Sequence, residues 1–320
     1  MTGFSRFGVA PETLLLTSNG QVPIGKLDGQ EVDVWTGDKF ETTSIFKVAE
    51  NQPLVTITAA NGSEFECSRD HLFIVQPGYR PDKLLLKEAQ ELEIEERLTK
   101  SPAFPIIEGG SKEFPYAYTH GFYVGAEKYR RGTNKTSRAA IYGARRPILD
   151  VLDIDRERTD KVNIYFKEDM PHYTELPLGE DYSLRTRLEW LAGFFDGGLA
   201  RRKVTHRPSW LAYSDSGDLL NNVRLLTQTL GGDTRVIANE DLYRAPYSWR
   251  VAGPMMQTLQ KLNIPTIYTQ LPGVIEYQRR GVECPKISKV EDSFRTSDVY
   301  NFIGTENKAA IFNGLYTSSN

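Results

Sequence analysis

Eight residues near the middle of the chain decide its expected fold: LAGFFDGG, residues 191–198. An apolar run that ends in paired glycines predicts a helix, and one interpretation is an ordinary core helix with a glycine cap. The residues that follow extend the pattern. They predict an amphipathic helix at 218–232, alternating strands at 235–237 and 247–253, and a further helix at 255–262. This order predicts an α+β unit built on the first helix.

The octapeptide and the order of the elements after it resemble one half of a LAGLIDADG homing endonuclease. Leu191, Ala192, Gly193 and Asp196 match the motif of that family, whereas Gly198 stands where the family has a metal-binding carboxylate. The resemblance implies a helix whose small residues pack backbone to backbone against a second motif helix. It also implies that Asp196, the earlier acid of the motif, is mainly structural.

The second motif helix is expected at residues 116–127, where the run from Gly121 to Gly125 is similar to a degenerate form of the motif. Ala126 occupies the position of the acid. Glu127 lies one residue further on, about 100° around a helix, and is a weak candidate metal ligand. The alternative is a core helix or strand rich in aromatic residues.

The endonuclease resemblance also implies a cofactor. An intact enzyme of this family would hold Mg²⁺ between the two motif acids and the scissile phosphates, where it activates water and stabilises the leaving oxygen. Because both carboxylates are missing, we expect the metal site to be lost and much of the DNA-contacting surface to remain.

Both ends of the chain resemble a second family, the inteins, whose splicing domain has the Hint fold. Residues 12–27 are similar to the opening block, residues 61–73 to the block with a Thr-x-x-His pattern, and residues 298–302 and 311–320 to the final two blocks. The resemblance implies a multidomain protein. A β-rich, horseshoe-like Hint domain is then split into segments 1–105 and 283–320, and an α+β endonuclease domain with two pseudo-symmetric halves is inserted at 112–282.

The intein resemblance assigns chemistry to individual residues. Splicing needs an N-terminal Cys or Ser that takes the preceding acyl group, a histidine that protonates the scissile amide nitrogen, oxyanion donors, and a terminal Asn that cyclises. His71 fits the histidine, Ser68 stands in place of the threonine beside it, and Asn320 fits the cyclising residue at the end of an excised intein. The alternatives are a turn histidine for His71 and a disordered terminus for Asn320.

The N-terminal junction departs from the intein pattern. The family spacing places the first intein residue at Gly8, which has no nucleophile, so that residues 1–7 would be flanking sequence. A variant class of inteins bypasses this residue with a Cys in the penultimate block, but Asn301 stands at that position. The first acyl shift is therefore not expected by the ordinary route.

The C-terminal junction departs from the pattern as well. Lys308 and Ser318 stand where histidines are usual, and Asn320 lies one residue later than the usual spacing, which leaves Ser319 as a second candidate for the cyclising position. We therefore expect both active centres to be disabled. Natural decay and deliberate substitution both remain open as the cause at the three positions that lack a reactive group, which are Gly8, Ala126 and Gly198.

Length and composition are those of an ordinary globular protein with room for two cores, at 320 residues and 39% hydrophobic residues. No apolar run approaches about 18 residues and no signal peptide is present, so neither membrane insertion nor secretion is expected. Two cysteines are too few for a disulfide framework. These observations fit a reducing cytoplasm, with Cys67 packed inside a strand, and the two family resemblances imply a monomer in a microbial or phage-infected cell.

The charge distribution points to nucleic acid only after the chain is divided. Residues 112–282 carry about 25 Lys and Arg against about 20 Asp and Glu, and the remainder carries about 14 against about 22. In the LAGLIDADG family the sheet after each motif helix lies in the major groove, where basic residues contact phosphates and guanine edges. The candidate DNA-binding residues are Arg130, Arg131, Arg138, Arg145, Arg146, Arg201, Arg202, Lys203 and Arg207. The alternative for each is a solvated basic face.

The combined resemblance implies an intein with an embedded homing endonuclease. Its expected activities are self-splicing, by N–S or N–O acyl shift, transesterification and Asn cyclisation, and site-specific cleavage of double-stranded DNA. The expected partners are a double-stranded DNA site and the flanking host segments, or exteins. Two alternatives remain: a non-splicing, intein-derived DNA-binding or recombination protein, and a Hint autoprocessing module like that of hedgehog-like proteins, which lack such an insertion.

Overall fold

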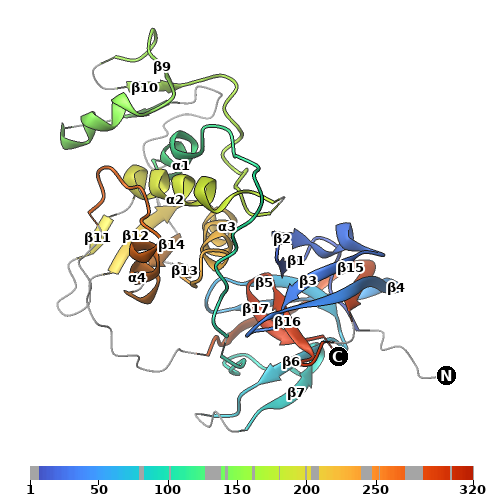
Figure 1. Cartoon of the computed structure of the whole chain (residues 1–320). Coiled ribbons are helices and arrows are strands. Elements are labelled where there is room, and N and C mark those ends of the chain that lie inside the picture. Colours follow the sequence, from blue (N-terminus) through green and yellow to red (C-terminus); the bar gives the residue numbers. More distant parts are fainter. Residues whose placement is uncertain are drawn as a thin grey trace. The chain divides into compact units, whose positions relative to one another are not determined.

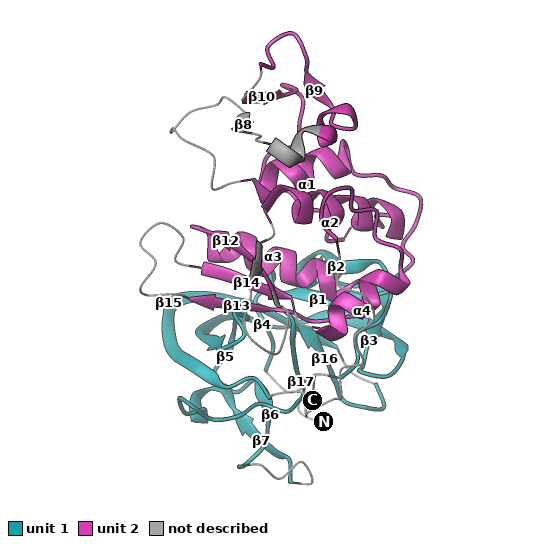
Figure 2. Cartoon of the chain, turned by 90° about the vertical axis from the view of Figure 1, so that its left-hand side faces the viewer, with its two compact units in different colours: residues 1–107, 278–320 teal, residues 108–277 magenta. Residues whose placement is uncertain are grey.

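The computed structural model describes the chain with gaps: residues 7–78, 83–100, 102–126, 138–140, 143–160, 163–179, 181–198, 200–202, 209–238, 247–251, 253–270, 284–302 and 305–319. Contacts divide the chain into two compact units (Figure 2). The first unit comprises Met1–Ile107 and Gln278–Asn320, and the second comprises Glu108–Tyr277. The second unit is therefore inserted, in sequence, between the two segments of the first.

The first unit is built on an eight-stranded antiparallel sheet with the order β15-β4-β3-β1-β16-β17, in which β2 also pairs with β1 and β5 with β4. The strands are β1 Leu14–Thr17, β2 Gly20–Pro23, β3 Glu31–Trp35, β4 Phe40–Ala59, β5 Glu64–Ser68, β15 Ile287–Phe302, β16 Ala309–Phe312 and β17 Leu315–Ser318. Figure 1 shows the red C-terminal strands among the blue N-terminal ones. Strands from the N-terminal and the C-terminal segments therefore form one sheet.

Smaller elements complete the first unit. They are the 3₁₀ turns η1 Ile24–Leu27 and η2 Ala89–Glu91 and the hairpin of β6 Leu72–Val75 with β7 Leu85–Glu88. The turn between β16 and β17 consists of Asn313 (φ 44°) and Gly314 (φ 79°), and two consecutive positive φ angles are typical of a tight hairpin turn. Cys67 is a fully buried residue of β5 and belongs to the core of this unit, as predicted.

The second unit contains two small sheets and the helices that pack on them. Helix α1 (Ala117–Gly125) is followed in the sequence by the sheet β8-β10-β9, and helix α2 (Leu184–Gly198) by the sheet β11-β12-β14-β13. The remaining bounds are β8 Arg138–Ala140, η4 Gly143–Asp150, β9 Ile154–Asp155, β10 Asn163–Phe166, β11 Ala200–Arg202, β12 Ser209–Ser214, α3 Gly217–Gln228, β13 Arg235–Ala238, β14 Tyr247–Val251 and α4 Gly253–Lys261. The helices and strands predicted downstream of residue 198 are confirmed.

Helices α1 and α2 touch each other through their backbones. A Cβ atom added at any of five glycines would meet backbone atoms of the opposite helix within van der Waals distance: Gly121, Gly125, Gly193, Gly197 and Gly198. Glycine is required at such positions because only a residue without a side chain lets two backbones approach this closely. The predicted packing of the two helices through small residues is therefore present.

Each half of the second unit has its own apolar core. Phe122 of α1 packs with Ile164 and Phe166 of β10, whereas Trp190 of α2 belongs to a larger cluster with Trp249 of β14. No helix in the described part of the chain is long and apolar enough to cross a membrane.

Candidate functional site

The backbone at Gly8 lies between two strands of the first unit. Val9 forms isolated bridges with Cys67 of β5 and with Tyr300 of β15. The Val9 N–H donates to the Tyr300 carbonyl at 3.0 Å, and the Tyr300 N–H donates back at 2.9 Å. Gly8 itself is buried. The peptide bond between Phe7 and Gly8 is therefore held in a defined place by the sheet.

Ser68, at the end of β5, contacts both polar groups of Gly8. The Gly8 N–H donates to the Ser68 hydroxyl oxygen at 2.9 Å, and that hydroxyl donates to the Gly8 carbonyl at 3.3 Å. The Ser68 N–H donates to the same carbonyl at 2.9 Å. The Ser68 hydroxyl therefore accepts from the amide nitrogen of the Phe7–Gly8 bond.

A side chain at position 8 would have little room. A Cβ there would lie 2.7 Å from the Tyr300 carbonyl oxygen and 2.9 Å from a methyl carbon of Val48. Both distances are shorter than ordinary van der Waals contact, so a larger residue requires the backbone around residue 8 or its neighbours to move.

His71 lies one turn after Ser68 and is fully buried in an aromatic box. Its backbone N–H donates to the Ser68 carbonyl at 3.1 Å. Its ring makes edge contacts, at centroid distances of 5.3 to 6.2 Å, with four phenylalanines: Phe7, Phe65, Phe73 and Phe312. Because these rings exclude water, burial lowers the pKa of His71 from 6.5 to about 3. The imidazole is therefore neutral at physiological pH.

Asn301, near the end of β15, connects the two ends of the site. Its Nδ2 donates to the Phe7 carbonyl at 3.2 Å and to the Ser319 carbonyl at 3.0 Å. Its Oδ1 accepts from the Phe302 N–H at 2.9 Å, which fixes the orientation of the amide group. One side chain therefore holds carbonyl groups that lie 312 residues apart in the sequence.

Ser318 and Ser319 are held by the backbone of Lys308. The Ser319 N–H donates to the Lys308 carbonyl at 2.8 Å, and the Ser318 hydroxyl donates to the same oxygen at 3.2 Å. Both serines are buried, and the Ser319 hydroxyl has no partner among the described residues. Asn320 lies outside the described residues.

Phe7 and Thr317 also belong to this site, although no motif singled them out. Phe7 forms one wall of the aromatic box and offers its carbonyl to Asn301. Thr317 places its hydroxyl 3.4 Å from His71 Nε2. The only available signal was their sequence position next to Gly8 and Ser318.

The two positions expected to bear acids, at the ends of α1 and α2, are both buried. Ala126 belongs to the core cluster that contains Phe122. A Cβ at Gly198 would collide with the Gly125 carbonyl oxygen. A carboxylate at position 198 would therefore require the two helices to move apart. Glu127 lies outside the described residues.

Asp196 is fully buried, and both oxygens of its carboxylate accept hydrogen bonds from within the second unit. Oδ2 accepts from the Tyr118 hydroxyl and the Ile267 N–H, both at 2.7 Å. Oδ1 accepts from the N–H groups of Tyr268 at 3.2 Å and Thr269 at 2.6 Å. Burial and this carboxylate together raise the pKa of Tyr118. Asp196 therefore ties α1 and the segment 267–269 to α2.

The side chains predicted to contact DNA lie outside the described part of the structure. Arg130, Arg131, Lys203 and Arg207 belong to undescribed segments. For the others only the backbone is described: Arg138 in β8, Arg145 and Arg146 in η4, and Arg201 and Arg202 in β11. Within the described residues, no group of three or more His, Cys, Asp or Glu side chains could hold a metal ion.

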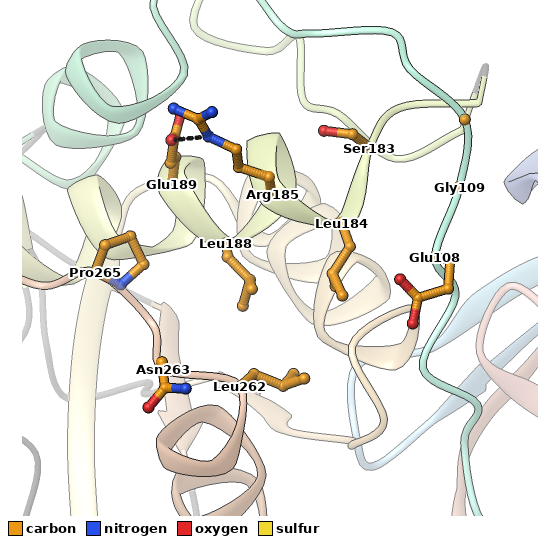
Figure 3. Close-up of a pocket in the computed structure, with 11 residues that line it drawn as sticks. Glu108, Gly109, Ser183, Leu184, Arg185, Leu188, Glu189, Leu262, Asn263 and Pro265 are labelled. Carbon is orange, nitrogen blue, oxygen red and sulfur yellow. Dashed lines mark hydrogen bonds and ion pairs between the residues drawn. The ribbon is translucent and has the colours of Figure 1, made fainter.

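A cavity of about 630 Å³ lies in the second unit, beside the first turns of α2 (Figure 3). Leu184, Leu188 and Leu262 supply its apolar surface. Its charged lining includes Arg185, which pairs with Glu189 at 2.7 Å. None of the residues predicted to carry chemistry lines this cavity.

Comparison with known proteins gives one curated relative, and no protein-family model matches the chain. The ribonucleoside-diphosphate reductase large subunit of Invertebrate iridescent virus 6 is 26% identical over 347 residues, which cover 98% of this chain and 36% of the viral protein. The chain therefore spans about a third of the length of the relative that it matches.

Inteins are among the similar solved structures. A mutant of an Ssp DnaB mini-intein variant is 10% identical, with a TM-score of 0.32, over 98% of this chain and 99% of that chain. A DnaB intein from Synechocystis sp. is 17% identical, with a TM-score of 0.24, over 31% of this chain and 69% of that chain.

Proposed function

We propose that this chain is an intein whose splicing centre is the site around Gly8. The observation that supports this most directly is the double hydrogen bond of Asn301 to the carbonyls of Phe7 and Ser319. Splicing requires that two junctions at opposite ends of a domain meet in one place, and an ordinary enzyme site has no such requirement. The motif pattern at both ends of the sequence supports the same function.

The geometry indicates what each residue would do in the first step. With a cysteine at position 8, its sulfur attacks the Phe7 carbonyl carbon, the C–N bond between Phe7 and residue 8 breaks, and a thioester and a free amine form. Neutral His71 can accept the thiol proton and return it to the leaving nitrogen, so the step is balanced in protons. Asn301 Nδ2 donates to the oxygen that becomes negative, and Ser68 holds the leaving nitrogen.

The same geometry explains why the chain as it stands would not start this reaction. Gly8 supplies neither a thiol nor a hydroxyl, and Asn301, at the bypass position, supplies only an amide. The positioning groups around the junction are nevertheless all in place. We therefore place the defect in this first step at position 8, which lacks a nucleophile and has little room for a side chain.

The test uses a Gly8→Cys variant with a reporter protein attached before residue 1. We expect an added thiol such as dithiothreitol to release the reporter by attack on the thioester, and His71→Ala in the same background to slow release by about 10²–10⁴ fold. Gly8→Ala is the matched control, because it introduces the same crowded Cβ without a nucleophile. If Gly8→Cys releases no more reporter than Gly8→Ala, this is not a splicing centre.

We further propose that the host protein is a ribonucleotide reductase large subunit. The alignment covers nearly all of this chain but only 36% of the viral protein, as expected when an intein lies inside a longer host protein. The proposal predicts that the gene encodes reductase sequence directly before residue 8 and after residue 320. Sequencing across both junctions tests it, and unrelated flanking sequence would exclude this host.

We propose a second function for the second unit: binding of double-stranded DNA by a LAGLIDADG-derived domain. The glycine-packed pair of α1 and α2, each followed by a small antiparallel sheet, supports it. The described residues do not fit Mg²⁺ at the helix ends. Ala126 and Gly198 offer no side-chain donor atom, and the Asp196 carboxylate already accepts four hydrogen bonds.

A gel-shift assay on the uninterrupted reductase coding sequence tests this second function. We expect binding that weakens steeply as salt increases, because phosphate contacts release counterions. Random DNA of equal length is the control, and equal affinity for both would exclude sequence-specific recognition. Cleavage that depends on Mg²⁺ would show that a metal centre survives.

A further inference from the structure

Thr317 of β17 meets the ring of His71 across the splicing centre. Its side chain is fully buried, its hydroxyl donates to the Leu72 carbonyl at 2.7 Å, and the same oxygen lies 3.4 Å from His71 Nε2. A hydroxyl group has only one proton to donate. Because that proton is directed to Leu72, the contact with His71 requires the hydrogen to be on Nε2.

The other ring nitrogen of His71, Nδ1, accepts no hydrogen bond from the described residues. A neutral imidazole has one N–H group and one acceptor nitrogen, so an Nε2–H tautomer leaves Nδ1 as the acceptor. His71 Nδ1 is buried and has no hydrogen-bond partner among the residues that the structure describes. Buried polar atoms are normally paired, and an exception calls for an explanation. The four phenylalanine edges around the ring oppose rotation that would exchange the two nitrogens.

We propose that Thr317 is a positioning residue that selects the Nε2–H tautomer of His71 and thereby keeps Nδ1 free as the proton acceptor for the N-terminal junction. The catalytic meaning of this tautomer rests on the proposed splicing function. The tautomer itself does not, because the contacts that set it are present whether or not the chain reacts.

This assignment links the two ends of the splicing domain. Thr317 pairs with Ala310 in the β16–β17 hairpin, and β16 is held in the sheet by β1. The reactive tautomer of His71 is therefore favoured once the C-terminal strand has joined the sheet. The consequence is that folding of the C-terminal junction makes the N-terminal bond more reactive.

Two variants separate the hydrogen bond from the shape of the side chain. Thr317→Val keeps the branched shape and removes the acceptor, and Thr317→Ser keeps the hydroxyl. Loss of one neutral hydrogen bond changes an equilibrium by about fivefold. We therefore expect the ratio of the two His71 tautomers to change by about fivefold in Thr317→Val and to remain that of the unchanged chain in Thr317→Ser.

The measurement is ¹⁵N NMR of the full chain labelled at histidine, in which the ring nitrogens report the tautomer directly. The chain contains four histidines, and a His71→Gln variant identifies the His71 signals by their loss. We expect an Nε2-protonated ring in the unchanged chain. An Nδ1-protonated ring, or an identical ratio in the unchanged chain and in Thr317→Val, would overturn the assignment.

Reporter release in the Gly8→Cys background supplies the second measurement. Thr317→Val should slow release, by at most the fivefold factor by which the tautomer ratio changes, and Thr317→Ser should restore it. Absence of release from Gly8→Cys, with the expected tautomer change, would refute the splicing function and leave the role of Thr317 intact. Normal release with an unchanged tautomer ratio would refute the role of Thr317 alone.

Discussion

The contact between α1 and α2 allows a prediction in which helix propensity and packing change the stability of the protein in opposite directions. Gly193 lies in the middle of α2, and the perturbation is Gly193→Ala. Alanine is favoured over glycine in a helix by about 1 kcal/mol, so that propensity alone predicts a more stable protein. The added methyl group, however, would collide with the Tyr118 carbonyl oxygen and lie 2.8 Å from the Phe122 backbone nitrogen.

The packing effect is expected to be the larger one. Overpacking a core commonly costs about 1–3 kcal/mol, and backbone atoms cannot rotate away as a flexible side chain can. We take the upper end of that range and subtract the gain in propensity, which leaves a net loss of about 2 kcal/mol. For a unit of this size, that loss lowers the Tm by roughly 4–8 °C.

Thermal unfolding followed by tryptophan fluorescence reports on the second unit, because Trp190, Trp210 and Trp249 belong to it. Gly217→Ala is a suitable control. It adds the same methyl group at the first residue of α3, where the nearest atoms are side-chain carbons of Tyr247 at 3.1–3.3 Å that can move aside. A Gly193→Ala protein as stable as the unchanged chain, or more stable, would refute the backbone-to-backbone contact.

Two further predictions concern buried ionisable groups. Burial lowers the pKa of His71 from 6.5 to about 3 in the folded chain. Below pH 6.5 the unfolded chain therefore binds a proton at His71, and the folded chain does not. Stability should therefore fall between pH 6.5 and 3, with a slope from this residue of at most about 1.4 kcal/mol per pH unit, and acid unfolding of His71→Gln should show a correspondingly smaller slope. Asp196→Asn should destabilise the second unit by about 2–4 kcal/mol. The new amide NH₂ group would face the Tyr118 hydroxyl and the Ile267 N–H, two donors that now donate to the carboxylate. Urea unfolding checks it, and a loss below 0.5 kcal/mol, which is about the effect of an ordinary surface substitution, would contradict the role given to this carboxylate.

Much of the local structure could be predicted because it depends on nearby residues. The 3.6-residue periodicity after residue 217 predicts α3, and the alternation near residue 250 predicts β14. The same local reasoning assigned Gly198 as a position vacated by a carboxylate. It could not reveal that the carbonyl of Gly125 occupies the space beside it, because that contact joins residues far apart in the sequence.

The sequence by itself determined the helix at 191–198, the order of the elements after it, and the four stretches that resemble splicing blocks. The helices and strands follow from residue spacing, which backbone geometry converts directly into secondary structure, and the splicing blocks follow from the resemblance to inteins. Only the tertiary structure showed that Asn301 donates to the carbonyls of Phe7 and Ser319 and that the Thr317 hydroxyl contacts His71. Those contacts depend on the register of β15 and β17 in a sheet assembled from both ends of the chain. A local pattern predicts a strand and a turn fixes the register of a hairpin, but neither specifies a partner strand that lies far away in the sequence, as β4 does for β15.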